Sequence, residues 1–191
     1  MEQADRRIDK IIRVATVPSF ITGLTVLLLY MPAHVFGLRE FIMLEVCLLL
    51  IPSLAYPASE LIRRSADRRS GQRNTAMIFS AVGYLIGFVW MLLYPCSQVT
   101  KVLLLSYVIS IVALIILNKG FHYKASGHSC ALTAPTTLLT WQLTPLAIIP
   151  CALLIGAAYA SSIKLGRHNL AQLLTGSAIS VAAVLVSMII L

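Results

Sequence analysis

The sequence has little charge. Asp, Glu, Lys and Arg together make up 12% of its 191 residues, half the roughly 25% found in soluble domains. Acidic residues are the scarcer sign, with 7 Asp and Glu against 15 Lys and Arg. Apolar residues reach 59% and the mean hydropathy is +0.88. A soluble domain is excluded, because too little polar surface is left to cover a protein of this size.

Cysteine is also scarce. The four cysteines are Cys47, Cys96, Cys130 and Cys151, and their positions lack the spacing of metal ligands. They fall mostly inside or at the ends of apolar segments, as small buried side chains do. The sequence therefore indicates neither a disulfide scaffold nor a metal site, and no cofactor is expected.

Long apolar runs are abundant. A membrane-spanning helix needs about 17–25 mainly apolar residues. Segments of this kind lie at 14–32, 41–58, 75–95, 99–117, 129–144, 146–163 and 170–191. We therefore predict a single all-α polytopic membrane domain over residues 1–191, a helix bundle with about seven transmembrane helices, six being possible. The segment 129–144 is short and contains Pro135, so it is expected to kink or to pack against other helices.

Basic residues gather on one side of the predicted bundle. Seven crossings place 13 of the 15 Lys and Arg on the side of the N-terminus, and only Arg39 and Lys101 on the other. The N-terminus and this basic face are predicted to be cytoplasmic, by the positive-inside rule. Short loops and the lack of organelle signals favour a prokaryotic plasma membrane. The basic excess thus points to topology and anionic lipid, and nucleic acid is not expected as a partner.

Three polar segments lie on this basic face, at 63–73, 122–129 and 161–172. Polar residues are costly in a membrane protein, so such clusters predict a functional site. Each segment also has a simpler interpretation: the arginines of 63–73 as a topology signal, Ser126 as a helix N-cap, and His168 as an interfacial histidine. His168 and Gln172 are four residues apart, so a helix places them on one face within hydrogen-bonding reach.

Taken together, these residues suit phosphate chemistry. Arginine guanidinium groups bind phosphate oxygens and stabilise charge that develops in the transition state. The main-chain N–H groups of Ser126 and Gly127, near a helix start, add donors for an anion. Of His128 and His168, one can attack phosphorus while the other protonates the leaving alkoxide, because imidazole exchanges protons near neutral pH.

This pattern resembles the type 2 phosphatidic acid phosphatase superfamily, which includes lipid phosphate phosphatases and vanadium haloperoxidases. Its second motif, Pro-Ser-Gly-His, is similar to Ala-Ser-Gly-His at 125–128. Its third motif, Ser-Arg, five residues, His, three residues, Asp, is similar to 161–172, with His168 at the histidine position. Its first motif, Lys, six residues, Arg-Pro, is best matched with Arg73 as the arginine. The resemblance covers roughly residues 60–180.

The resemblance implies a membrane phosphatase that hydrolyses a phosphatidate-like or polyprenyl-phosphate-like monoester or diphosphate through a phosphohistidine intermediate, without a metal. His168 would be the nucleophile, His128 the general acid, and Gln172 the group that orients His168. The implied phosphate-binding residues are Arg73, Arg69, Ser126, Gly127, Lys124 and Arg167. The expected partners are the bilayer and a phospholipid or polyprenyl phosphate substrate.

Several positions depart from the family's motifs. Ala66 occupies the position of the lysine in the first motif. Ser162 and Gln172 occupy the positions of the arginine and the aspartate in the third motif. The amide oxygen of Gln172 can accept the imidazole N–H and fix the tautomer of His168. It adds no negative charge, so the nucleophile is expected to be less basic than in the family.

Two other functions are consistent with the same residues. A catalytically impaired relative would bind anionic lipid or lipid phosphate for transport or scaffolding. A small membrane cytochrome or carrier would use His122, His128 and His168 as ligands, and would show visible haem absorbance.

Overall fold

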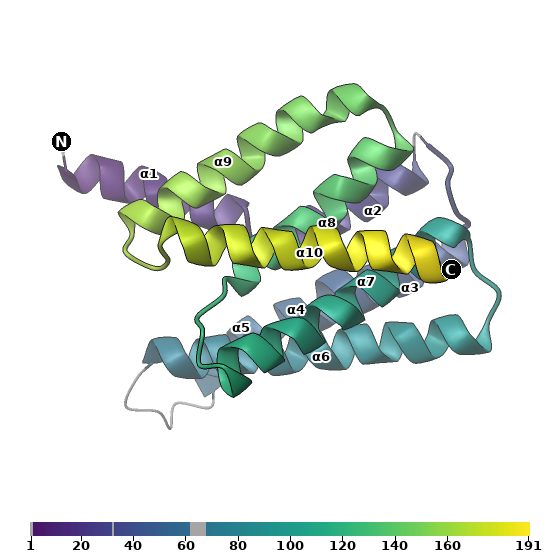
Figure 1. Ribbon diagram of the computed structural model, residues 1–191, viewed down its shortest axis with the longest axis horizontal. Helices are drawn as coiled ribbons and strands as arrows, with labels where there is room; N and C mark the ends of the chain where they lie inside the picture. Colours follow the sequence, from purple (N-terminus) through teal and green to yellow (C-terminus); the bar gives the residue numbers. More distant parts are fainter. Residues whose placement is uncertain (1, 32, 62–67) are drawn as a thin grey trace.

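The computed structural model describes residues 2–31, 33–61 and 68–191, which form an all-α helical bundle (Figure 1). The elements are α1 (Glu2–Ala15), α2 (Pro18–Tyr30), α3 (Leu38–Leu44), the π-helix η1 (Glu45–Leu50), α4 (Ile51–Ser53), α5 (Ala55–Leu61), α6 (Arg68–Leu93), α7 (Gln98–Ile115), the π-helix η2 (Ile116–Gly120), α8 (Gly127–Gln142), the 3-10 helix η3 (Pro145–Ala147), α9 (Ile148–Lys164) and α10 (Leu170–Ile190).

Each of the seven predicted apolar segments contains a helix, so the predicted all-α membrane bundle is confirmed. Within the described ranges, five helical stretches are long and apolar enough to cross a membrane. They are Leu38–Leu61, Asn74–Leu93, Gln98–Gly120, Pro145–Lys164 and Leu170–Ile190. The other two segments form α2 and α8, of 13 and 16 residues, which are shorter than the usual length of a span. The chain is therefore an integral membrane protein.

The predicted boundary of the first span, 14–32, was wrong at its start. Residues up to Ala15 belong to α1, and a new helix, α2, begins at Pro18. Proline has no N–H and is favoured in the first turn of a helix, so α2 begins at Pro18. Thr16 and Val17 form the joint between the two helices, and α1 precedes the bundle as a helix of its own.

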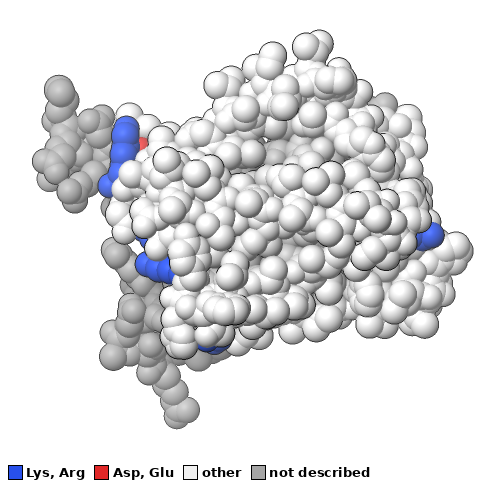
Figure 2. All heavy atoms as spheres, in the orientation of Figure 1, with Lys and Arg blue, Asp and Glu red and all other residues white. Residues whose placement is uncertain are grey.

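Lys and Arg gather at the two ends of the bundle, whereas the acidic Glu45 lies within the Leu38–Leu61 stretch. Figure 2 shows Lys and Arg at these ends, with the flank between them free of charged side chains in this view. Arg7, Lys164 and Arg167 are exposed at the end where α9 leads into α10. Arg39 and Lys101 lie in the first turns of α3 and α7 at the opposite end. The predicted separation of basic residues is thus present among the described residues.

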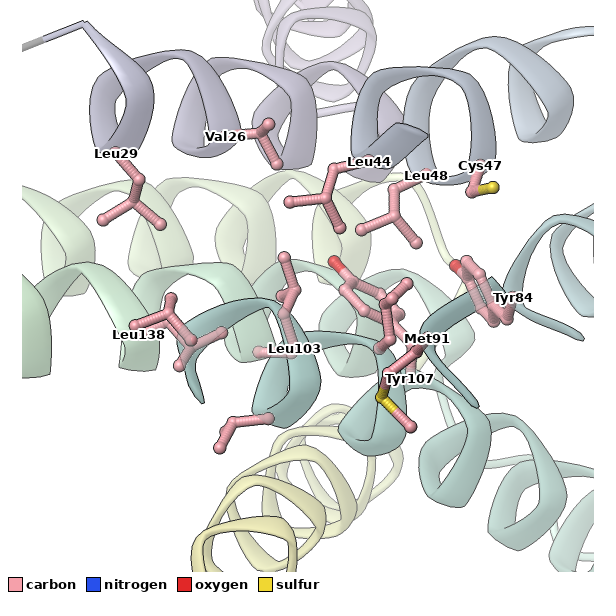
Figure 3. Packing of buried hydrophobic residues seen from close by; sticks show 14 of the residues in the cluster. Val26, Leu29, Leu44, Cys47, Leu48, Tyr84, Met91, Leu103, Tyr107 and Leu138 are labelled. Atoms are coloured by element: carbon pink, nitrogen blue, oxygen red, sulfur yellow. The ribbon is translucent and has the colours of Figure 1, made fainter. Parts of the chain in front are cut away.

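The apolar core lies where α2, α3, η1, α6, α7, α8 and α10 meet (Figure 3). Leu29, Leu44 and Leu138 are fully buried there. Tyr107 of α7 lies at the centre, with its ring 4.7 Å from that of Tyr84 and its hydroxyl oxygen 2.6 Å from Thr22 Oγ1. The core thus locks α7 against α2 and α8 and sets the position of α8, whose N-terminus carries the Ser-Gly-His turn.

A proline lies in the middle of α8. Pro135 has no N–H, so the carbonyl of Ala131 loses the donor that a helix normally supplies four residues later. The hydroxyl of Tyr107 donates to this carbonyl at 3.2 Å, as a neighbouring helix must when water is absent. Half of the residues of α8 are buried, and the helix packs against α2, α7, α9 and α10. The prediction that this segment packs against other helices is confirmed.

Replacing Tyr107 with Phe is expected to lower the free energy of unfolding by about 1–3 kcal/mol, because the Ala131 carbonyl is left without a donor. The midpoint of thermal unfolding in detergent measures this loss. Pro135→Ala restores a main-chain N–H four residues after Ala131, so the loss should shrink when Tyr107→Phe is made in that background. Equal losses in both backgrounds would contradict this role of Tyr107.

Candidate functional site

The N-termini of α8 and α10 meet at the basic end of the bundle (Figure 1). Ser126 caps α8, and its hydroxyl oxygen accepts the N–H of Ser129 at 3.2 Å. The N–H of Ser126 donates to the main-chain carbonyl of Gln172, in the first turn of α10, at 3.0 Å. The hydroxyl of Ser129 donates to the carbonyl of Leu173 at 2.8 Å. These bonds join the Ser-Gly-His turn directly to the start of α10.

The two helices approach so closely because α10 has a glycine at the contact. A Cβ atom on Gly176 would collide with the carbonyl oxygen of Ser126 and the hydroxyl of Ser129. Small residues at crossing points are the usual means by which membrane helices bring their backbones together. Gly176 therefore sets the distance between the two N-termini.

The predicted hydrogen bond between His168 and Gln172 is confirmed, with Nδ1 and Oε1 3.1 Å apart. His168 lies outside α10, one residue before its N-cap Asn169, so the bond is not made along a helix face as expected. Gln172 instead folds back as part of a capping box, in which its Oε1 accepts the N–H of Asn169 at 3.2 Å and the Asn169 side chain accepts the Gln172 N–H at 2.9 Å.

The capping box determines the tautomer of His168. A main-chain N–H can only donate, so the Gln172 atom facing Asn169 is the amide oxygen. The same oxygen faces Nδ1 of His168, and Nδ1 must therefore carry the hydrogen. The lone pair of the neutral ring is then on Nε2. Gln172 orients the imidazole in the way that the sequence predicts.

His128 is the second residue of α8 and is half-buried. Its Nε2 lies 3.3 Å from the hydroxyl of Thr16, in the joint between α1 and α2. The sequence interpretation missed Thr16, because it extended the first span through this joint. Pro18 was the signal that the helix must begin anew there.

Two of the predicted phosphate-binding cations lie on the loops that lead into the two helices. Lys124 precedes the cap of α8 by two residues, and Arg167 directly precedes His168; both are exposed. The N–H of Arg167 donates to the carbonyl of Ser162 at 3.0 Å, in a turn where Gly166 has a φ of 61°. Glycine suits this left-handed conformation because it has no Cβ.

The arginines of the first motif are placed only in part. Arg69 and Arg73 lie in the first two turns of α6, but their side chains lie outside the described residues, as does Ala66. α6 begins at the basic end and packs against α7, which lies between α6 and α10 (Figure 1). The roles of Arg69 and Arg73 stay predictions.

A set of hydroxyl groups behind the site was also missed. The Tyr159 hydroxyl of α9 donates to the carbonyl of Leu173 at 3.0 Å and lies 2.7 Å from Ser177 Oγ. Ser177 is in turn 2.7 Å from Thr133 Oγ1 of α8. Ser177 lies four residues after Leu173, and Thr133 lies four residues after Ser129. Because residues four apart share a helix face, this spacing indicates that both continue the contact between α8 and α10. These bonds hold α8, α9 and α10 together below the histidines.

Among the residues that the structure describes, no group of three His, Cys, Asp or Glu is close enough to hold a metal ion. His122, one of the three histidines considered as haem ligands, is exposed in a loop with a φ of 54°.

Comparison of the chain with protein-family models, with curated proteins and with solved structures gave no match. The function is therefore inferred from the residues of the chain and their contacts.

Proposed function

We propose that the protein is a membrane phosphatase that hydrolyses a lipid-linked phosphate monoester or diphosphate through a phosphohistidine intermediate. The observation that carries this proposal is the bond from the Ser126 N–H to the Gln172 carbonyl. It places the Ser-Gly-His turn beside the His168–Gln172 pair at one end of the bundle. A nucleophile, a second histidine and the start of α8 at Gly127 are thus gathered at one end of the bundle, where Lys124 and Arg167 are exposed.

The chemistry follows from these atoms. Nε2 of His168 attacks phosphorus, and the bond from phosphorus to the lipid oxygen breaks while His128 gives that oxygen a proton. His128 then takes a proton from water as the water attacks the phosphohistidine, which releases phosphate and restores His168. The N–H of Gly127, with Lys124 and Arg167, stabilises the negative charge on the phosphoryl oxygens.

A lipid is the proposed substrate because of where the histidines lie. They are at the junction between the charged end and the flank that bears exposed apolar residues, among them Leu170 and Leu174, which are 54% and 52% exposed on α10. A phosphate on a lipid is presented at this depth of the bilayer. By the positive-inside rule this end faces the cytoplasm, and we propose a prokaryotic plasma membrane as the location.

The residues match the type 2 phosphatidic acid phosphatase motifs at Ser126, Gly127, His128 and His168, which is why turnover is proposed. One observation favours a second function. Ser162, at the position of the family's third-motif arginine, is fully buried and provides no cation. A relative without turnover would still bind a lipid phosphate at the same helix starts, for transport or scaffolding.

Phosphate release from a panel of lipid phosphates tests the proposal. The purified chain is given phosphatidate, lysophosphatidate, a polyprenyl phosphate and a polyprenyl diphosphate in mixed micelles. Release of inorganic phosphate from at least one of them is expected. Saturable binding of a lipid phosphate without release would establish the second function in place of the first.

Gln172→Leu is expected to lower kcat by about 10–100-fold with little change in KM, because it removes the acceptor that orients His168. Gln172→Glu keeps the acceptor and adds negative charge, which raises the pKa of His168. The neutral nucleophile then forms only at higher pH, so the acidic limb of the kcat/KM profile should move upward. Asn169→Ala, which removes the N-cap alone, controls for helix stability. An unchanged kcat in Gln172→Leu would exclude the orienting role.

A further inference from the structure

One side of α1 is left uncovered by the bundle. Ile8, Ile11 and Val14 are 54%, 67% and 67% exposed. They recur every three residues, so they form one apolar stripe along the helix. Asp9 of α1 is buried, and α1 packs along α9. The helix therefore has a packed side and an apolar side with no protein partner among the described residues.

The surroundings of the stripe indicate what covers it. α1 lies at the basic end of the bundle, and the exposed cations Arg7, Lys164 and Arg167 are there. Beyond the joint, Phe20 of α2 is also apolar and 56% exposed. α1 thus has an apolar stripe with cations nearby and lies next to a membrane-spanning bundle. These features are typical of a helix that lies in the plane of the membrane at the headgroup layer. Anionic headgroups complement its cations.

The other end of α1 reaches the candidate site. Thr16, 3% exposed, follows the last residue of α1, and its hydroxyl oxygen is 3.3 Å from His128 Nε2. Only two residues separate α1 from α2, so a displacement of α1 must move Thr16. The placement of α1 on the bilayer and the environment of His128 are thus mechanically linked.

We propose that α1 is a membrane-surface helix that couples the bilayer to the candidate site. Its Ile8, Ile11 and Val14 side chains enter the acyl boundary of an anionic leaflet, and this attachment holds the Thr16 hydroxyl against His128. The functional importance of that contact rests on the proposed role of His128 as general acid. Neither arm of the test below requires turnover.

Hydrogen exchange tests the attachment. The full chain is placed in nanodiscs of phosphatidylcholine alone and of phosphatidylcholine with phosphatidylglycerol. The α1 amides are expected to exchange about tenfold more slowly in the anionic discs. This factor corresponds to roughly the attraction of one or two basic residues to anionic headgroups. The variant with Ile8, Ile11 and Val14 all changed to Ser should lose this slowing. Ile189→Ser, at an 84% exposed position of α10 far from α1, is the matched control and should keep it.

Carbethoxylation of histidine tests the coupling. In wild type, His128 should react with diethyl pyrocarbonate more slowly in anionic discs than in neutral ones. The triple serine variant and Thr16→Val should both react quickly in either lipid. His34, exposed in the loop before α3 at the opposite end, is the internal control and should react equally in all samples.

Two results would overturn the inference. One is a His128 rate that neither the lipid nor the α1 variants change. The other is slow exchange of α1 in detergent with a particle of twice the protein mass, since a second copy would then cover the stripe. If exchange and carbethoxylation respond as expected while no lipid phosphate is hydrolysed, the proposed function is wrong and the coupling stands.

Discussion

Replacing His168 with Ala is expected to lower phosphate release from a lipid phosphate by about 10³-fold or more, because the variant has no nucleophile to form the phosphohistidine. The hydrogen bond from Nδ1 to Gln172 leaves the lone pair of the neutral ring on Nε2, the atom that would attack phosphorus. Initial rates of phosphate release at saturating substrate measure the effect. A rapid-quench trap with labelled substrate should show an acid-labile phosphoryl group on wild type and none on the variant.

His128→Ala separates the general acid from the nucleophile. With a lipid alkoxide as leaving group the variant should lose about 10²–10⁴-fold in kcat. With para-nitrophenyl phosphate the variant should form the phosphohistidine at nearly the wild-type rate, because nitrophenolate leaves without needing a proton. His168→Ala should be inactive toward both substrates, so the pair of substrates distinguishes the two roles.

The chain supplies a matched control for these histidine variants. His34→Ala removes an exposed imidazole at the opposite end of the bundle and should leave every rate unchanged. Full phosphate release by His168→Ala would refute the phosphohistidine mechanism. Lipid-phosphate binding without release in wild type would refute the assignment as an enzyme.

Gly176→Ala is expected to lower the free energy of unfolding by about 3 kcal/mol, the upper end of the range for overpacking. The added Cβ collides with the Ser126 carbonyl and the Ser129 hydroxyl, and neither can move without displacing the start of α8. The bonds from Ser126 to Gln172 and from Ser129 to Leu173 should be lost with it. Both the unfolding midpoint in detergent and lipid-phosphate turnover per folded molecule should fall.

Two other glycines control for the substitution itself. A Cβ on Gly83 would collide with the carbonyl of Cys47, so Gly83→Ala should destabilise the bundle at the contact between α6 and η1 while turnover per folded molecule is kept. A Cβ on Gly156 has nothing within 4 Å, so Gly156→Ala should be neutral or stabilising by up to about 1 kcal/mol. If Gly176→Ala, like Gly83→Ala, lowered stability but kept turnover per folded molecule, the α8–α10 contact would not determine the geometry of the site.

The helices themselves were predictable because hydropathy is a property of consecutive residues. Each apolar run identified in the sequence contains a helix. The exact start of the first run was misjudged, since apolar residues continue across Thr16 and only Pro18 marks the break. The shortness of α8 and its dependence on neighbours were anticipated from Pro135, but the donor that compensates for it, Tyr107, is distant in sequence.

The candidate site was predictable in its residue types and in one contact. The spacing of His168 and Gln172 predicts their hydrogen bond, which the structure contains. The reason differs, because the bond comes from a capping box around Asn169 and not from a continuous helix. The contact of Thr16 with His128 was not predictable, since no periodic pattern relates residues 112 positions apart.

The sequence by itself determined that this protein lies in a bilayer and which end of it is basic. Its scarcity of charge and its apolar runs require a bilayer, and the positions of its Lys and Arg determine which end is basic, because both properties add up along the chain. The tertiary structure alone decided that the starts of α8 and α10 touch and that the joint after α1 reaches His128. Those contacts depend on how closely helices pack, which Gly176 and the core around Tyr107 control across the bundle.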